Sequence, residues 1–99
     1  MQDTRECIIP PEVFSDPKRR EILRAWVANQ GLHASIWIPD DWAKPANWGI
    51  ALTDIMRHLA DAYQKSHGIA PEETIRQIRE TIAAELASPT SDTSGDFVE

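Results

Sequence analysis

The sequence is poor in cysteine and in long hydrophobic runs. Cys7 is the single cysteine among 99 residues, which excludes an internal disulfide and a CxxC metal or redox site. The longest apolar runs are only a few residues long, far short of the roughly 20 needed to cross a bilayer, and no secretory signal follows Met1. We therefore expect a cytoplasmic protein with no membrane partner.

Positive charge is also scarce. The chain carries 10 Lys and Arg against 16 Asp and Glu, for a formal net charge of -6. Most of the excess acid lies near the two ends, and the segment 13–87 is close to neutral. A nucleic-acid-binding protein usually carries a basic stripe, whereas the one basic cluster in this sequence, Lys18-Arg19-Arg20, is flanked by Asp16 and Glu21. The charge pattern therefore argues against nucleic acid as a partner.

The chain divides into three parts. Residues 1–12 are mostly polar, with a brief apolar patch stopped by Pro10-Pro11, and are predicted to form an amino-terminal arm or a short edge strand. Residues 13–87 are predicted to form one domain, because the chain is too short for two. Residues 88–99 are small, polar and acidic, which predicts a disordered acidic tail.

Residues 21–38 allow two interpretations. Ser15-Asp16-Pro17 is typical of a helix start, and Gly31 would then be the stop. The alternation of apolar and polar residues over 32–38 favours a strand instead, with the preceding apolar segment as its hairpin partner. We favour the hairpin, with a two-residue turn at Gln30-Gly31. A three-residue loop ending in a glycine bulge is the alternative register.

This turn predicts two unlike sheet faces. One face is entirely apolar and pairs Val27 with Ala34, Ala25 with Ile36, and Leu23 with Ile38. The opposite face is polar and aromatic and pairs Ala28 with His33, Trp26 with Ser35, and Arg24 with Trp37. The last pair predicts a cation–π contact between Arg24 and the Trp37 ring.

Two helical patterns follow the hairpin. Apolar residues from Trp48 to Tyr63 form one stripe of a helix that begins near Pro45 and ends at Gly68. A second helix begins at Pro71 and ends before Pro89, with an apolar stripe of Ile75, Ile78, Ile82 and Leu86. The predicted fold class is α+β: an antiparallel β-hairpin, with room for a third short strand, and two amphipathic helices packed on its apolar face.

Three segments resemble one family. They are RAWVANQGLHASI (residues 24–36), PANWGIALTDIMRHLA (residues 45–60) and IRETIAAELASP (residues 78–89). Together they resemble the small bacterial proteins of domain of unknown function 5076, over about residues 21–89. The resemblance implies a bacterial protein that folds as a stand-alone domain, and it implies no activity, cofactor or catalytic residue.

Asp54, His58 and Asp61 form the sharpest polar constellation. Spacings of four and three place them on one helical face, where they could hold a divalent metal ion or supply a base. The polar side of an amphipathic helix with ordinary ion pairs gives the same pattern, and zinc sites are usually richer in His or Cys. We expect neither a metal nor a cofactor and keep these three residues as the metal candidates.

Three other features receive structural interpretations. His33 and Ser35 lie on the same side of their strand but are roughly 6.6 Å apart, too far for a nucleophile–base pair. His67 places a favourable charge near the end of the long helix. Gly49 lies where free backbone N–H groups could hold an anion, but close packing against Trp42 explains a small residue more simply.

Tryptophan is the least ordinary feature of the sequence. Trp and Arg are enriched at interface hot spots, and Trp26 and Trp37 are predicted on the sheet face that the helices leave uncovered. The predicted interface or ligand patch consists of Arg24, Trp26, His33, Ser35, Trp37 and Trp42. In the alternative, the amino-terminal arm folds across this face through Ile8, Ile9, Val13 and Phe14 and completes a core.

These features predict a non-catalytic interaction module more readily than an enzyme. We expect it to form a homodimer, or to bind a protein partner, through the aromatic sheet face or an open strand edge, because two-fold association is a common way to cover such surfaces. The alternative is a small-molecule or metal-dependent enzyme that uses the Asp54, His58 and Asp61 face. Nucleic-acid binding through Lys18-Arg19-Arg20 ranks last.

Overall fold

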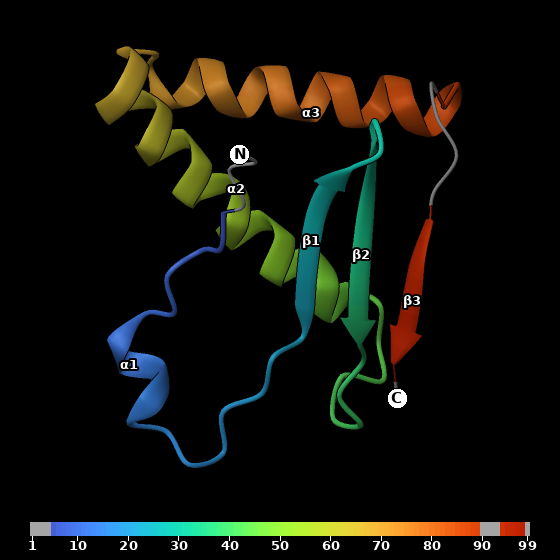
Figure 1. Cartoon of the computed structure of the whole chain (residues 1–99). Coiled ribbons are helices and arrows are strands. Elements are labelled where there is room, and N and C mark those ends of the chain that lie inside the picture. Colours follow the sequence, from blue (N-terminus) through green and yellow to red (C-terminus); the bar gives the residue numbers. More distant parts are fainter. Residues whose placement is uncertain (1–4, 90–93, 99) are drawn as a thin grey trace.

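The computed structural model describes residues 5–89 and 94–98 as an α+β fold with a β-hairpin, which confirms the predicted fold class. The elements in chain order are α1 (Pro11–Phe14), β1 (Leu23–Ala28), β2 (Gly31–Trp37), α2 (Ala46–His67), α3 (Pro71–Ala87) and β3 (Ser94–Val98). The three strands form one sheet, whereas α2 and α3 meet at one end and diverge from there (Figure 1).

The hairpin forms as predicted, but in a register shifted by two residues. The apolar face pairs Leu23 with Ile36, Ala25 with Ala34, and Val27 with Leu32. The turn residues are Asn29 and Gln30, with φ of 51° and 64°, so the predicted turn at Gln30-Gly31 is wrong. Every residue keeps its predicted face, because side chains alternate with a period of two. The observed register gives Leu32 an apolar partner in Val27, whereas the predicted register placed Leu32 opposite Asn29.

The second edge of β2 pairs with a strand from the predicted tail. β3 runs parallel to β2, from Ser94 beside His33 to Val98 beside Trp37. The prediction of a disordered tail over residues 88–99 is therefore wrong for residues 94–98. The physical reason is that the free edge of β2 offers backbone partners, and Phe97 and Val98 are residue types that favour strands.

The long helices begin and end near the predicted signals. α2 ends at Gly68, which has a φ of 68° and donates its N–H to the Gln64 carbonyl at 3.1 Å. α3 begins at Pro71, where a missing N–H costs no helical hydrogen bond, and ends at Ala87. Neither helix, nor any other described one, combines the length and hydrophobicity that a bilayer span requires.

Little of the chain is buried. Among the described residues with assigned burial, 5–89, only Pro39, Ala60 and Thr74 are buried. On the apolar sheet face, Val27 is 86% exposed and Leu32 is 63% exposed, so no described helix covers the turn end of this face. The helical stripes are also partly exposed, with exposed members Leu52, Ile55, Leu59, Tyr63, Ile82 and Leu86.

Candidate functional site: an aromatic sheet face

One face of the hairpin gathers five of the six predicted site residues. Direct partners across two strands share a face, and the register places Arg24 opposite Ser35 and Trp26 opposite His33. Trp37 lies on the same face, because it follows His33 and Ser35 at intervals of two along β2. We call these five residues the aromatic face.

The outer strand carries the exposed part of the aromatic face. Trp26 is 45% exposed and the Arg24 side chain is 58% exposed, both on β1. His33, Ser35 and Trp37, on the central strand β2, are half-buried. A large amphipathic ring beside a guanidinium is the composition found at interface hot spots. The β1 side of this face is therefore the part that a partner can reach.

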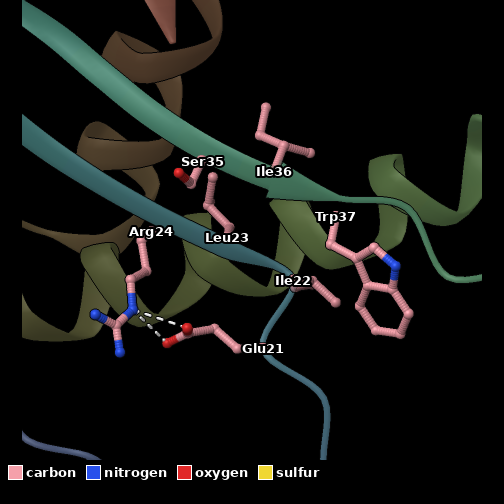
Figure 2. Close-up of a pocket in the computed structure, with 7 residues that line it drawn as sticks. All are labelled: Glu21, Ile22, Leu23, Arg24, Ser35, Ile36 and Trp37. Carbon is pink, nitrogen blue, oxygen red and sulfur yellow. Dashed lines mark hydrogen bonds and ion pairs between the residues drawn. The ribbon is translucent and has the colours of Figure 1, made fainter. Parts of the chain in front are cut away.

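Two ion pairs hold the cations around this face. The Arg24 Nε donates to both carboxylate oxygens of Glu21 at 2.8 Å (Figure 2), and this bond raises the pKa of Arg24. The Arg20 Nη1 donates to Asp41 at 2.7 Å, which lowers the pKa of that carboxyl, and the Arg20 guanidinium lies 5.8 Å from the Trp37 ring centroid. The predicted contact of Arg24 with Trp37 is therefore wrong, because the observed register moves these two residues apart.

Sequence reasoning missed Arg20 as a site residue. It belongs to the Lys18-Arg19-Arg20 cluster, whose pattern indicated a solvated charge run. The contact with Trp37 joins two segments 17 positions apart, and local periodicity carries no signal for such a contact. The available clue was the position of Arg20 shortly before β1. The start of β1 lies across from the end of β2, where Trp37 stands.

His33 has a structural contact within the hairpin. Its Nε2 lies 3.0 Å from the carbonyl oxygen of Ala28, the last residue of β1. This contact ties the imidazole to the turn end of the hairpin. The ring therefore helps to hold β1 and β2 in their register.

Trp42 contacts α2 instead of completing the aromatic face. Its ring meets the Trp48 ring edge-on, with centroids 5.5 Å apart and an interplanar angle of 84°. Both tryptophans are half-buried. The predicted packing of Gly49 against Trp42 is wrong, because a Cβ added at Gly49 would meet no atom within 4 Å.

The amino-terminal arm does not complete a core over the aromatic face. Ile8 is 90% exposed and Phe14 is 60% exposed. The Phe14 ring lies 5.7 Å from the Arg19 guanidinium, in the segment that follows α1. Residues 11–14 form a helical turn in place of a continued arm or edge strand, because Pro11 fits the first position of a helix.

The carboxylates of the metal candidates take part in helix ion pairs. Asp54 pairs with Arg57 at 3.7 Å, and Asp61 pairs with Lys65 at 2.9 Å. These two carboxylates and His58 lie on exposed residues of α2. In the part of the chain that the structure describes, no group of three or more His, Cys, Asp or Glu residues is placed to hold a metal ion.

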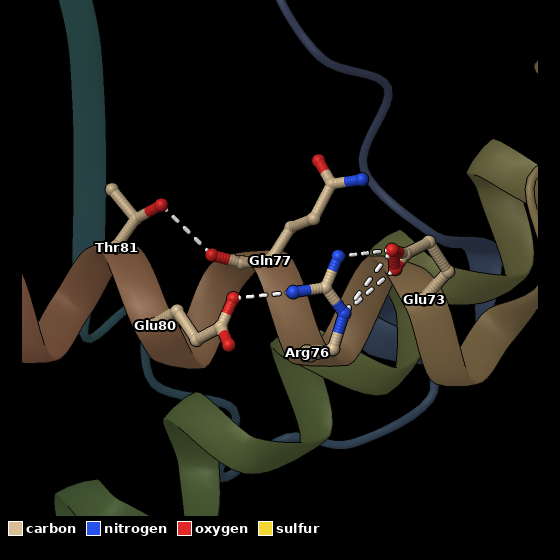
Figure 3. A network of polar contacts seen from close by, with 5 residues as sticks. All are labelled: Glu73, Arg76, Gln77, Glu80 and Thr81. Atoms are coloured by element: carbon tan, nitrogen blue, oxygen red, sulfur yellow. Dashed lines mark hydrogen bonds and ion pairs between the residues drawn. The ribbon is translucent and has the colours of Figure 1, made fainter.

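Two shallow hollows lie on the described surface. One, of about 310 Å³, is lined by residues 21–24 and 35–37 at the open end of the hairpin (Figure 2). The other, of about 320 Å³, lies along α3, where Arg76 pairs with Glu73 and Glu80 (Figure 3). The first hollow includes three residues of the aromatic face, so it adjoins the candidate site.

Comparisons with known proteins give a family and similar solved structures. The family model described as Domain of unknown function (DUF5076) matches residues 6–90. No curated protein matches the chain. The chain is similar to the "Structure of a putative pyruvate dehydrogenase from the photosynthetic bacterium Rhodopseudomonas palustrus CGA009", with 29% sequence identity, a TM-score of 0.72 and coverage of 100% of both chains.

Proposed function

The chain belongs to the family of domain of unknown function 5076, and we propose that it is a non-catalytic interaction module that binds a second copy of itself through the β1 side of the aromatic face. The observation that supports this proposal is the exposure of β1 on both faces, with Trp26 45% and Val27 86% exposed. Large apolar side chains exposed on an edge strand are a common feature of interaction sites. The proposal includes the bacterial cytoplasm as the site of action, and the composition and the family support it.

A second copy is the partner that fits best. β1 carries a single charge, Arg24, so two copies of the strand can meet without an excess of like charge. Two-fold pairing covers the same patch on both chains at once, and it is the commonest form of self-association. The small buried core gives association a further role, because contact with another chain supplies burial that one chain lacks.

The solution mass tests this proposal. Light scattering coupled to gel filtration, over a range of concentrations, is expected to give twice the 11.2 kDa mass of the chain. Trp26→Ala should raise the dissociation constant at least ~10-fold, as truncation of a hot-spot residue does. Ile8→Ala, at an apolar residue of the arm that is 90% exposed, is the control and should change little. A monomer at every concentration, or a Trp26→Ala variant that associates like the wild type, contradicts the proposal.

The competing function is an enzyme that uses Asp54, His58 and Asp61. Its support is the helical spacing of these residues, and the solved relative described as a putative pyruvate dehydrogenase suggests pyruvate oxidation as the reaction. An assay with pyruvate and an electron acceptor, together with calorimetric titration of divalent metals, tests it. Turnover would establish the enzyme over the interaction module, and a saturable heat that His58→Ala abolishes would establish the metal site that such an enzyme could use.

A further inference from the structure

The hairpin hydrogen bonds identify the backbone groups of β1 that point away from β2. β1 is an edge strand in the order β1-β2-β3. The Trp37 N–H donates to the Ile22 carbonyl at 3.0 Å, so these two residues form a hydrogen-bonded pair. Such pairs alternate along an antiparallel ladder, so every second residue from Ile22 directs its N–H and C=O at β2. The groups that point outward belong to Leu23, Ala25 and Val27.

The outer edge of β1 lacks the features that usually prevent strand addition. Natural edge strands are protected by proline, bulges or several charges. β1 has six residues in continuous register with β2, contains no proline, and carries Arg24 as its one charge. The opposite edge of the sheet, β3, contains Gly95 and Asp96, which are residue types that disfavour strands. β1 is therefore the edge at which another strand adds most readily.

We propose that β1 pairs antiparallel with β1 of a second copy, with Ala25 on the two-fold axis, so that two sheets join into one. This inference rests on the proposed self-association and specifies its geometry. Leu23 then faces Val27 of the second copy on the apolar side. Arg24 faces Trp26 of the second copy on the aromatic side, at a position where direct partners come closest.

Backbone pairing selects this register. Two-fold pairing must match outward-pointing residues with one another, which allows centres at Arg24, Ala25 or Trp26 near the middle of β1. With Ala25 at the centre, all the outward N–H and C=O groups of β1 find partners. With Trp26 at the centre, those of Leu23 lie beyond the end of the other strand, and with Arg24 at the centre, those of Val27 do.

The side chains favour the same register. A guanidinium over an indole ring gives a cation–π contact, and the arrangement forms it twice, once on each side of the axis. The small Ala25 side chains meet at the axis and allow close approach. The two Arg24 side chains are offset along the strands, so like charges do not face each other.

A cysteine scan in the Cys7→Ser background determines the register of the two paired β1 strands. Across the axis, the Cα atoms of Ala25 would lie roughly 5.5 Å apart, within the range of a disulfide. Those of Val27 would be offset by four residues, roughly 13 Å along the strand, which is out of range. We expect A25C to give at least ~10-fold more disulfide-linked dimer than V27C under mild oxidation. W26C should cross-link efficiently only in the register centred on Trp26.

A charge variant tests the edge without a disulfide. Ala25→Lys places two ammonium groups at the axis and should raise the dissociation constant at least ~10-fold. Ala43→Lys adds the same charge at an exposed loop residue and is the matched control. Circular dichroism of each variant confirms that the hairpin and helices are retained.

The outcomes separate this inference from the proposed function. A dimer in which A25C cross-links and Ala25→Lys dissociates supports both. A dimer in which W26C cross-links instead overturns the register centred on Ala25. A dimer in which V27C cross-links instead, or none of the three does, overturns the β1 pairing. Both results leave self-association standing. A monomer throughout overturns both proposals.

Discussion

The backbone conformation of Gln30 in the hairpin turn costs free energy, and a substitution can remove that cost. Asn29 and Gln30 have φ of 51° and 64°, and positive φ at both central residues is the geometry of a type I′ turn. Asparagine tolerates this region, whereas a residue with a long side chain incurs a cost of roughly 1–2 kcal/mol there. Glycine removes that cost but loses about 0.5–1 kcal/mol more backbone entropy on folding. Gln30→Gly should therefore increase the free energy of unfolding by about 0.5–1 kcal/mol.

Thermal and urea unfolding measure this gain. For a domain of this size, about 1 kcal/mol corresponds to a Tm change of roughly 4–8 °C, so we expect an increase of about 2–8 °C. All samples need the same protein concentration, because association shifts apparent stability. Gln30→Ala is the control, because it shortens the side chain and retains the Cβ that makes positive φ costly. A Gln30→Gly variant no more stable than Gln30→Ala would refute the reasoning.

Three further predictions concern the helices. The hydrogen bond from Arg76 lowers the pKa of Glu73, so its stabilising effect is present above the ordinary carboxyl pKa and is lost as pH falls through the lowered value. The Tm difference between wild type and Glu73→Gln should therefore be largest near neutral pH and should disappear in acid. A Tm difference that does not change with pH contradicts this. The buried Thr74 hydroxyl has no hydrogen-bond partner among the described residues, so Thr74→Val should raise the free energy of unfolding by about 1 kcal/mol in urea unfolding, and a loss contradicts this. Gly68→Ala, at a φ of 68°, should lower the free energy of unfolding by about 1 kcal/mol. Gly49→Ala, where an added Cβ meets no described atom within 4 Å, should raise it by about 0.5–1 kcal/mol. Equal effects of the two substitutions contradict this.

Local signals predicted the elements but not the hairpin register. Gly68 and Pro71 bound the two helices through the backbone properties of single residues, which a sequence displays directly. The register depends on cross-strand packing, and two neighbouring dipeptides, Asn29-Gln30 and Gln30-Gly31, both offer a turn. Glycine favours the second turn, but the pairing of Val27 with Leu32 belongs to the first, which is the one that forms.

The aromatic face was predictable because it follows from a period of two. Any register shift by an even number of residues leaves Trp26 and Trp37 on the same face, so the incorrect turn prediction did not change the predicted face of either residue. The Arg20 contact with Trp37 and the pairing of β3 with β2 connect distant segments. Such contacts depend on which edges and surfaces the fold leaves open, and no local pattern reports that.

Pairing through β1 would explain why the strand exposes residues on both faces. Val27 of one copy would lie beside Leu23 of the other, which extends the apolar face across the axis. Trp26 would lie beside Arg24 of the other copy on the aromatic face. A strand buried by association needs partners for both of its faces. The β1 strand of the second copy supplies them, on the apolar face and on the aromatic face. Because each chain has one such edge, pairing occupies that edge and limits the assembly to two copies.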